Sequence, residues 1–159
     1  ELLLPLAHPI EMSPATVADR TPSSDQTVGN RQATILVVDD EPRVRQVAAR
    51  WLVREGYTVL QAQNAESALK RIEELDGKVD VLFSDIVMPG KLDGRALANV
   101  VSKMFPDIAI QLTTGYEHER QHRVSSQDHQ DFPVISKPYD LQELSSTVRR
   151  LILKKLARV

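Results

Sequence analysis

Two short apolar runs of this chain each end in aspartates, and this repetition constrains the fold more than any other feature. The run Thr34 to Val38 (T-I-L-V-V) is followed directly by Asp39 and Asp40, and the run that starts at Val79 (V-D-V-L-F-S) ends in Asp85. Short runs rich in β-branched and apolar residues are typical of parallel strands buried on both faces. Because such strands bring their carboxyl ends to one edge of the sheet, we expect the three aspartates to lie together there.

Three carboxylates at one edge repel one another, so the arrangement requires either raised pKa values or a bound cation. The residues favour Mg²⁺, which accepts a few carboxylate oxygens and keeps several waters. Two further runs add complementary groups: Ile108 to Leu112 leads into Thr113 and Thr114, and Phe132 to Ser136 leads into Lys137. Metal, hydroxyl and lysine together would bind a phosphoryl group while one carboxylate attacks it.

Helical periodicity alternates with strands from Thr34 onward. Asn64 is a predicted N-cap, and Asp140 with Glu143 predicts a capping box for the last helix. Together, these strands and helices predict a (βα)5 chain, which is an α/β fold with a doubly wound parallel sheet. Apolar residues expected on the buried helix faces are Val44, Val47, Ala48, Trp51 and Leu52, then Ala65, Ala68, Leu69, Ile72 and Leu75, then Leu97, Val100, Val101 and Met104, and finally Leu141, Leu144, Val148, Leu151 and Ile152.

Five motifs, in their order and spacing, resemble the receiver domains of two-component response regulators. They are V-V-D-D-E at 37–41, S-D-I-V-M-P-G at 84–90, L-D-G at 92–94, T-T-G-Y at 113–116 and S-K-P-Y at 136–139. Any one of them is a weak signal, but together they are specific. The resemblance implies the flavodoxin-like strand order 2-1-3-4-5, which periodicity alone does not choose.

The resemblance also implies the roles of the acidic residues. Asp85 would take a phosphoryl group from a histidine of a kinase or of a histidine phosphotransfer protein. Mg²⁺ would be held by Asp40, Asp85 and the backbone carbonyl of Val87, with Asp39 contributing largely through water. The expected outcome is an aspartyl phosphate that shifts a two-state equilibrium.

Two further residues have implied roles in binding the phosphoryl group. Lys137 would pair with its charge, and Thr114, rather than its neighbour Thr113, would turn inward to bind it.

Val134 stands where the family commonly has an aromatic residue, which puts aromatic coupling in doubt here. The resemblance also implies a dimer surface made of the fourth helix, expected within 117–130, the fifth strand and the fifth helix. The residues expected to flank the phosphoryl site are Val87, Gly115, Tyr116 and Pro138, the last after a cis peptide bond.

Residues 1–33 differ in composition from the rest, with prolines among Ser, Thr, Asp and Asn and no regular period, so we predict a disordered linker before a receiver domain at 34–159. Its first part, E-L-L-L-P-L-A at 1–7, resembles the last strand of a histidine-kinase ATP-binding domain, although it could equally be an apolar terminus. The loop at 90–93 is one residue longer than in chemotaxis-type regulators. These features favour a fragment of a hybrid histidine kinase, and the alternative is a transcriptional regulator's receiver without its DNA-binding domain.

A competing motif lies between the fourth and fifth strands. His118-Glu119-x-x-His122 fits the zinc-hydrolase pattern, with Glu143 downstream as a further ligand. The stretch 117–130 has one clear apolar residue, Val124, so a helix there lacks a face to bury. We therefore expect a weakly anchored segment rather than a buried zinc helix.

Composition excludes several classes of protein. The net charge of −2 gives no reason to expect nucleic acid or an anionic membrane as a partner, and the absence of cysteine excludes disulfides and thiol catalysis. No apolar run approaches the roughly 18 residues of a transmembrane helix. We expect a bacterial, cytoplasmic domain with no ATP-binding catalytic domain of its own, whose parent protein could still be membrane-anchored.

Overall fold

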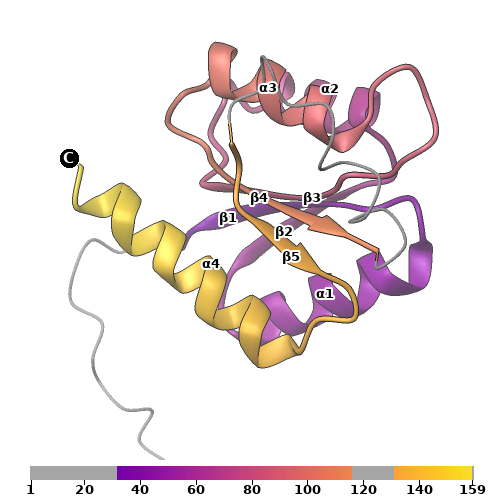
Figure 1. Ribbon diagram of the computed structural model, residues 1–159. Coiled ribbons are helices and arrows are strands. Elements are labelled where there is room, and N and C mark those ends of the chain that lie inside the picture. The colour runs from indigo at the N-terminus through magenta and orange to yellow at the C-terminus, as the bar shows by residue number, and fades with distance from the viewer. Residues whose placement is uncertain (1–31, 116–130, 159) are drawn as a thin grey trace, which may run out of the picture. The chain divides into compact units, whose positions relative to one another are not determined.

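The computed structural model describes residues 32–115 and 131–158, which form a five-stranded parallel sheet covered by helices on both faces (Figure 1). The strands are β1 (Thr34–Val38), β2 (Thr58–Ala62), β3 (Val81–Asp85), β4 (Ala109–Thr114) and β5 (Val134–Ser136). The helices are α1 (Pro42–Arg54), α2 (Ala65–Glu74), α3 (Gly94–Met104) and α4 (Leu141–Leu156). The sheet order is β2-β1-β3-β4-β5, so the predicted doubly wound fold and its strand order are confirmed.

The strand register brings the predicted strand tips to one edge. Val38 pairs with Ala62 and with Ser84, which places the residue after β1 next to the end of β3. Asp85 pairs in turn with Thr113 on β4. The aspartates, threonines and lysine therefore lie along a single carboxyl edge of the sheet.

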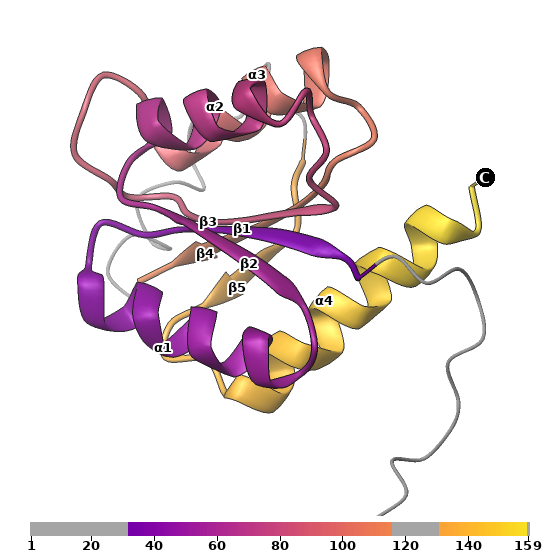
Figure 2. The same cartoon turned by 180° about the vertical axis from the view of Figure 1, so that it is seen from behind.

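Two hydrophobic layers hold the helices against the sheet. Figures 1 and 2 show α2 and α3 on one face of the sheet, and α1 and α4 on the other. Alternate residues of each strand supply the two layers, because successive side chains point to opposite faces. On β1, Leu36 and Val38 pack toward α2 and α3, whereas Ile35 and Val37 pack toward α1 and α4. This double burial explains the continuous apolar runs in the sequence.

Two predicted helix caps are present, and one is simpler than expected. Asn64 accepts a hydrogen bond from Ser67 N at 2.8 Å, and the Ser67 hydroxyl completes a capping box. Asp140 caps α4 by accepting from Gln142 N at 2.6 Å. Among the described residues, Glu143 makes no return bond to Asp140, so the predicted capping box at α4 is wrong while the cap itself is confirmed.

The burial of some helix residues and the start of the fifth strand differ from what the sequence predicts. Val47, Leu75 and Met104 are predicted on buried helix faces, but 53%, 36% and 55% of their surfaces are exposed. Val47 lies at the edge of the apolar stripe of α1, whereas Leu75 follows the last residue of α2 and Met104 is the last residue of α3, where the chain leaves the sheet. The fifth strand starts at Val134 rather than Phe132, since Pro133 has no N–H to donate to a ladder.

Two predicted segments fall mainly or wholly in the parts of the chain that the structure does not describe. Of the predicted linker, residues 1–33, the described part holds only 32 and 33. The H-E-x-x-H stretch at 118–122 lies entirely outside the described residues. In the portion of the chain that is described, no helix is both long enough and apolar enough to cross a membrane.

Candidate functional site

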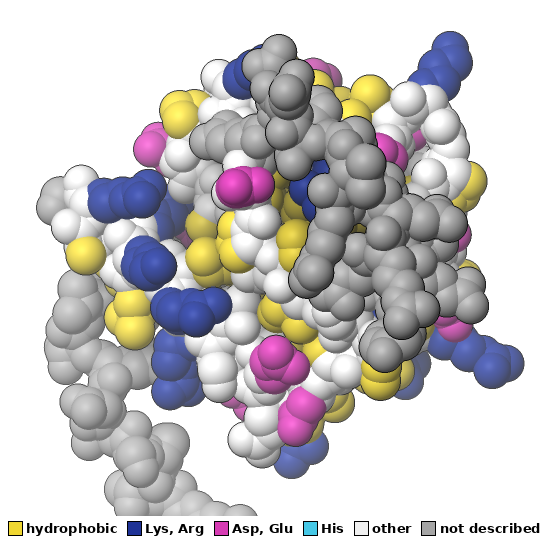
Figure 3. All heavy atoms as spheres, in the orientation of Figure 1, with side chains coloured by type: hydrophobic (Ala, Val, Ile, Leu, Met, Phe, Trp, Pro, Cys, Tyr) yellow, Lys and Arg dark blue, Asp and Glu magenta, His cyan; other side chains and the backbone are white. Residues whose placement is uncertain are grey.

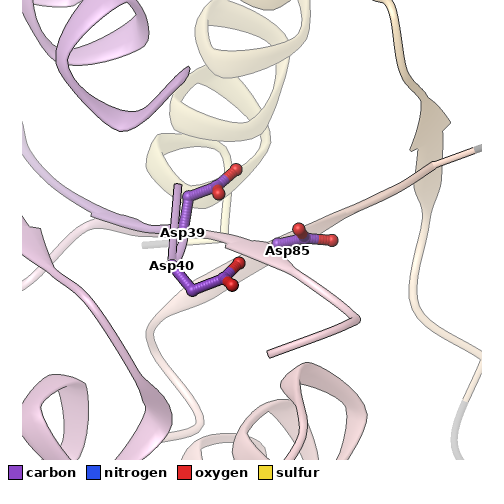
Figure 4. A group of neighbouring side chains, drawn as sticks. All are labelled: Asp39, Asp40 and Asp85. Atoms are coloured by element: carbon purple, nitrogen blue, oxygen red, sulfur yellow. The ribbon is translucent and has the colours of Figure 1, made fainter. Parts of the chain in front are cut away.

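Three aspartates gather at the carboxyl edge of the sheet. Asp39 and Asp40 follow β1 and Asp85 ends β3, and Figure 4 shows the three side chains side by side. Carboxylate oxygens of all three lie within 4.8 Å of one another. Asp39 and Asp85 are buried, with 4% and 7% of their surfaces exposed, whereas Asp40 is exposed. The site thus has two buried carboxylates and a third that opens to solvent.

Backbone hydrogen bonds fix the two buried aspartates. The Asp39 side chain accepts from Glu41 N at 2.9 Å, and the Asp85 side chain accepts from Val87 N at 3.2 Å. Each aspartate therefore uses one oxygen to order the turn that follows its own strand. The other oxygen is left to face the site.

Lys137 joins the two buried carboxylates. Its Nζ donates to Asp39 Oδ2 at 2.7 Å and to Asp85 Oδ2 at 2.8 Å. Its backbone N–H donates to the carbonyl of Thr114 at 2.7 Å, and its peptide bond to Pro138 is cis. The ammonium is thereby held between β1 and β3 although it comes from the end of the edge strand β5.

The site shifts the pKa values of its own groups. Burial raises the pKa of Asp85, although the hydrogen bond from Lys137 opposes that change. Burial alone would lower the pKa of Lys137, but its hydrogen bonds with Asp39 and Asp85 outweigh burial and raise the pKa. The lysine therefore stays charged and is the built-in counter-ion of the carboxylates.

Tyr139 lies between β5 and α4, near enough to the site for the charges of Lys137, Asp39 and Asp85 to act on its phenol. Its ring packs edge-on against Phe83 of β3, with the ring centroids 5.6 Å apart. Burial raises the pKa of the Tyr139 phenol to about 12, and the nearby carboxylates of Asp39 and Asp85 add to this effect against that of Lys137. The sequence placed Tyr139 in a motif but assigned it no role.

The loop after Asp85 is held by close contacts that the sequence did not reveal. A Cβ on Gly94 would lie 1.9 Å from the backbone oxygen of Asp85, so only glycine lets α3 start this close to β3. Glu66 of α2 accepts from Lys91 N at 3.2 Å, and Asp93 caps α3 by accepting from Ala96 N at 2.8 Å. Two residues of the L-D-G motif therefore have structural roles, Gly94 in close packing and Asp93 in capping α3.

Arg45 is a supporting residue that sequence reasoning missed. Its Nη1 donates to the backbone carbonyl of Asp39 at 2.6 Å, which fixes the start of the acidic turn from α1. The sequence feature that could have indicated this role is the position of Arg45 in the first turn of α1, the helix that follows the aspartates. Arginines at helical spacing are common on solvated faces, so that signal alone is weak.

The remaining predicted residues lie near the same edge. Thr113 and Thr114 are both buried, and the Thr114 hydroxyl donates only a long 3.4 Å bond, to Gly115 O. Val87 is 39% exposed beside Asp85. Tyr116, another of the predicted flanking residues, lies outside the described part of the chain.

The donor set suits a hard divalent cation. It consists of carboxylate oxygens from Asp39, Asp40 and Asp85, with no sulfur or imidazole donor in the described cluster. Mg²⁺ prefers such oxygen donors and completes its shell with water, for which the exposed side of Asp40 leaves access. Asp39 and Asp85 each already form an ion pair with Lys137, so a bound cation and the lysine would together neutralise these two carboxylates.

Comparison with known proteins agrees with this geometry. The family model described as the response regulator receiver domain matches residues 35–149. The chain is 38% identical over 123 residues to the sensor kinase CckA of Brucella abortus (strain 2308), a match that covers 77% of this chain and 13% of that protein. It is 30% identical over 119 residues to the response regulator receiver protein CpdR of the same organism, covering 75% of this chain and 96% of CpdR.

Solved structures show the same fold. A response regulator receiver domain protein from Clostridium thermocellum superimposes with a TM-score of 0.70 at 28% identity, covering 80% of this chain and 99% of that one. The receiver domain of the hybrid histidine kinase CckA gives a TM-score of 0.62 at 32% identity, covering 76% and 99%. Sequence and fold agree, and the chain belongs to the family of response regulator receiver domains, which act in two-component systems.

Proposed function

We propose that Asp85 is the phosphoacceptor of this receiver domain and takes its phosphoryl group from a phosphorylated histidine of a partner protein. The observation that carries this proposal is the bridge of Lys137 between the buried carboxylates of Asp39 and Asp85 at 2.7 and 2.8 Å. A charged lysine held against one oxygen of Asp85 is placed to neutralise a dianionic group added to that carboxylate.

In the proposed step, a carboxylate oxygen of Asp85 attacks the phosphorus and a new P–O bond forms as the P–N bond to the histidine breaks. The electron pair of that bond leaves with the imidazole, which takes a proton from solvent. Lys137 stays protonated throughout, as its raised pKa favours. The residues therefore supply position and positive charge, which is what phosphoryl transfer chiefly requires.

Mg²⁺ is the proposed cofactor, held by Asp40, Asp85 and the carbonyl of Val87, with Asp39 acting largely through water. When bound, it would neutralise charge on the phosphoryl oxygens. Thr114 is the proposed switch. Its present 3.4 Å hydrogen bond is longer than a good O–H···O bond, so little holds the hydroxyl away from a new phosphoryl oxygen.

The parent protein is proposed to be a hybrid histidine kinase. The match to the sensor kinase CckA supports this, although the chain spans 13% of that protein's length. A transcriptional regulator is the alternative, supported by 32% identity over 120 residues to the transcriptional regulator NtrC of Azospirillum brasilense, of which the chain spans 24%. The phosphodonor would be a histidine kinase or phosphotransfer protein in the cytoplasm, where the ATP that phosphorylates such histidines is available. A dimer is also part of the proposal. Its surface would consist of β5, of α4, which is the predicted fifth helix, and of the predicted fourth helix within 117–130, which lies outside the described residues.

Intact-mass measurement after incubation with acetyl phosphate and Mg²⁺ tests the assignment. We expect a single phosphoryl adduct that is stable in acid, labile to hydroxylamine and dependent on the metal. The matched control is Asp85→Asn, which keeps the side-chain shape and should carry no adduct. Asp107→Asn, an exposed aspartate before β4, should be phosphorylated like the parent chain.

Two outcomes would contradict the proposal. An adduct of equal amount on Asp85→Asn would move the phosphoacceptor elsewhere. No adduct, together with tight zinc binding that requires His118 and His122, would instead favour a zinc hydrolase.

A further inference from the structure

A groove of about 650 Å³ runs between α1 and α4, on the face of the sheet opposite α2 and α3. One wall is formed by Trp51 and Glu55, from α1 and its C-terminal end. The other wall is a stripe along α4 and the residue after it: Gln142, Ser145, Ser146, Arg149, Arg150, Leu153, Lys154 and Ala157. Residues of the stripe on successive helical turns lie three or four positions apart, which is the spacing of one helix face that packs against another helix.

Among the described residues, no further helix covers this face. Leu153 lies in the stripe with 60% of its surface exposed, and Leu156 beside it is 55% exposed. The stripe extends over the 16 residues of α4. At ~1.5 Å per residue this is about 24 Å, or four turns of a partner helix.

The groove has strong positive charge. Arg149, Arg150 and Lys154 are exposed, and none forms an ion pair within the described part of the chain. The single acidic residue of the lining is Glu55. Figure 3 shows Lys and Arg side chains gathered over the C-terminal half of α4, with hydrophobic side chains between them. The charge disfavours a second copy of this same face as the occupant, because like charges would meet.

Trp51 gives the groove a rigid aromatic wall. Its Nε1 donates to Ser145 Oγ at 2.7 Å, which ties α1 to α4, and the guanidinium of Arg54 lies 5.7 Å from its ring centroid. An aromatic ring held in this way is a typical anchor for an apolar side chain of a partner. Cations and an apolar anchor therefore occur together in one groove.

We propose that the α1–α4 groove is a docking site for an acidic amphipathic helix of a partner protein. Acidic side chains of that helix face Arg149, Arg150 and Lys154, while its apolar side chains pack between Trp51 and Leu153. These cations lie in the second half of α4, whereas Lys137 precedes the first turn of that helix. The docking site is thus separate from the phosphoacceptor edge, and its test does not depend on phosphorylation.

Fluorescence tests the proposal directly, because Trp51 is the only tryptophan of the chain. The probe is a tryptophan-free stapled helical peptide of about 16 residues, with Leu and Glu at alternating three- and four-residue steps. We expect a saturable blue shift of the Trp51 emission as the peptide excludes water from the ring. The affinity should fall at least tenfold between low and high salt, since charge pairing contributes to it.

Variants separate docking from non-specific attraction. Arg149→Glu with Arg150→Glu should weaken binding at least tenfold, and the milder Arg149→Gln with Arg150→Gln should weaken it less. Lys70→Glu with Lys103→Glu, two exposed lysines on α2 and α3, is the matched control and should bind like the parent chain. Circular dichroism confirms that each variant is folded.

Four results would overturn the proposal. The first is that the acidic peptide does not shift the Trp51 emission, and the second is that a peptide with Lys in place of Glu binds equally well. The third is that anionic vesicles shift the emission although the peptide does not. The fourth is that dimerisation of the chain alone produces the shift. Asp85→Asn should bind the peptide unchanged, so failure of the proposed phosphoacceptor and failure of the docking site can be told apart.

Discussion

At the scale of single residues, Lys137 is the counter-ion of two carboxylates that would otherwise be buried with only backbone hydrogen bonds. The side chains of Asp39 and Asp85 are 5% and 9% exposed, and the lysine side chain is 21% exposed. Removing one member of a buried ion pair is costly, because the charge left behind has lost its water and has no partner. The lysine is therefore needed for stability as well as for the proposed chemistry.

Replacing Lys137 by Met tests this role. We expect a loss of about 2 to 4 kcal/mol in the free energy of unfolding, reduced from the fully buried value because the lysine is partly exposed. Mg²⁺ should restore part of the loss by replacing the missing positive charge. Urea unfolding with and without Mg²⁺ measures both effects.

Lys155→Met is the matched control for that experiment. Lys155 pairs with Asp80 at 2.8 Å, but this pair lies away from the acidic cluster. Its loss should not be relieved by Mg²⁺. Equal rescue of both variants by the metal would contradict the idea that the ion and Lys137 neutralise the same carboxylates.

Tyr139 gives a prediction for alkaline pH. Burial raises the pKa of its phenol to about 12 from an ordinary value near 10. The folded protein thus holds this proton more tightly than the unfolded chain does. The stability from the protonated phenol is complete below about pH 10 and is lost as the pH rises toward 12.

Phenolate absorbance can follow this titration, since the chain has three tyrosines. We expect a late component in the parent chain that is absent from Tyr139→Phe. The variant should also lose less stability across this pH range. A late component that survives in Tyr139→Phe would assign the raised pKa to another tyrosine.

At the scale of elements, the start of α3 fixes the backbone of the phosphoacceptor. A Cβ on Gly94 would lie 1.9 Å from Asp85 O and 2.7 Å from Ile86 Cα, and backbone atoms cannot move aside as a flexible side chain can. Gly94→Ala should therefore cost about 3 kcal/mol, at the upper end of ordinary overpacking. It should also slow phosphorylation by roughly 10- to 100-fold, because the attacking oxygen is misplaced.

Gly115→Ala separates crowding from the general effect of replacing a glycine. Within the described residues, no atom beyond the adjacent ones lies within 4 Å of a Cβ at Gly115, so this variant should change stability by less than about 0.5 kcal/mol. Thermal unfolding and the mass assay compare the two. Similar losses in both variants would mean that close packing at α3 is not the cause.

Elements with strong local signals were predictable from the sequence, and those set by tertiary contacts were not. The strands β1 and β3 are apolar on both faces, and Asn64 has the chemistry of an N-cap, so the sequence predicted each of them correctly. Met104 and Val47 have apolar side chains at helical spacing, yet the helix surface there turns away from the sheet. The periodicity of the sequence alone does not determine how a helix is positioned on its sheet.

At the scale of the whole molecule, strand order could be predicted only through the family resemblance. Periodicity predicted alternating strands and helices, but many orders of five parallel strands satisfy it. The convergence of Asp39, Asp40, Asp85 and Lys137 depends on that order. Arg45 was missed because its partner is a backbone carbonyl, which leaves no mark in the sequence.

The final prediction concerns global stability. Asp40 and Asp85 extend from β1 and β3, which lie inside the sheet, so an ion bound between them should stabilise the fold as a whole rather than one loop. A ligand that binds only the folded state adds about 2.7 kcal/mol at 100 times its Kd. We therefore expect the unfolding midpoint to rise continuously with the logarithm of Mg²⁺ concentration above the Kd.

The change in midpoint with Mg²⁺, rather than the midpoint itself, is the quantity to compare, because removing one of several repelling carboxylates also alters stability without metal. Asp40→Asn and Asp85→Asn should each lose most of the Mg²⁺-dependent rise. Asp107→Asn should keep it in full, since that exposed residue precedes β4 at the opposite edge of the sheet. If all three variants responded to Mg²⁺ alike, the ion would be acting on general surface charge, and the acidic cluster would not be its binding site.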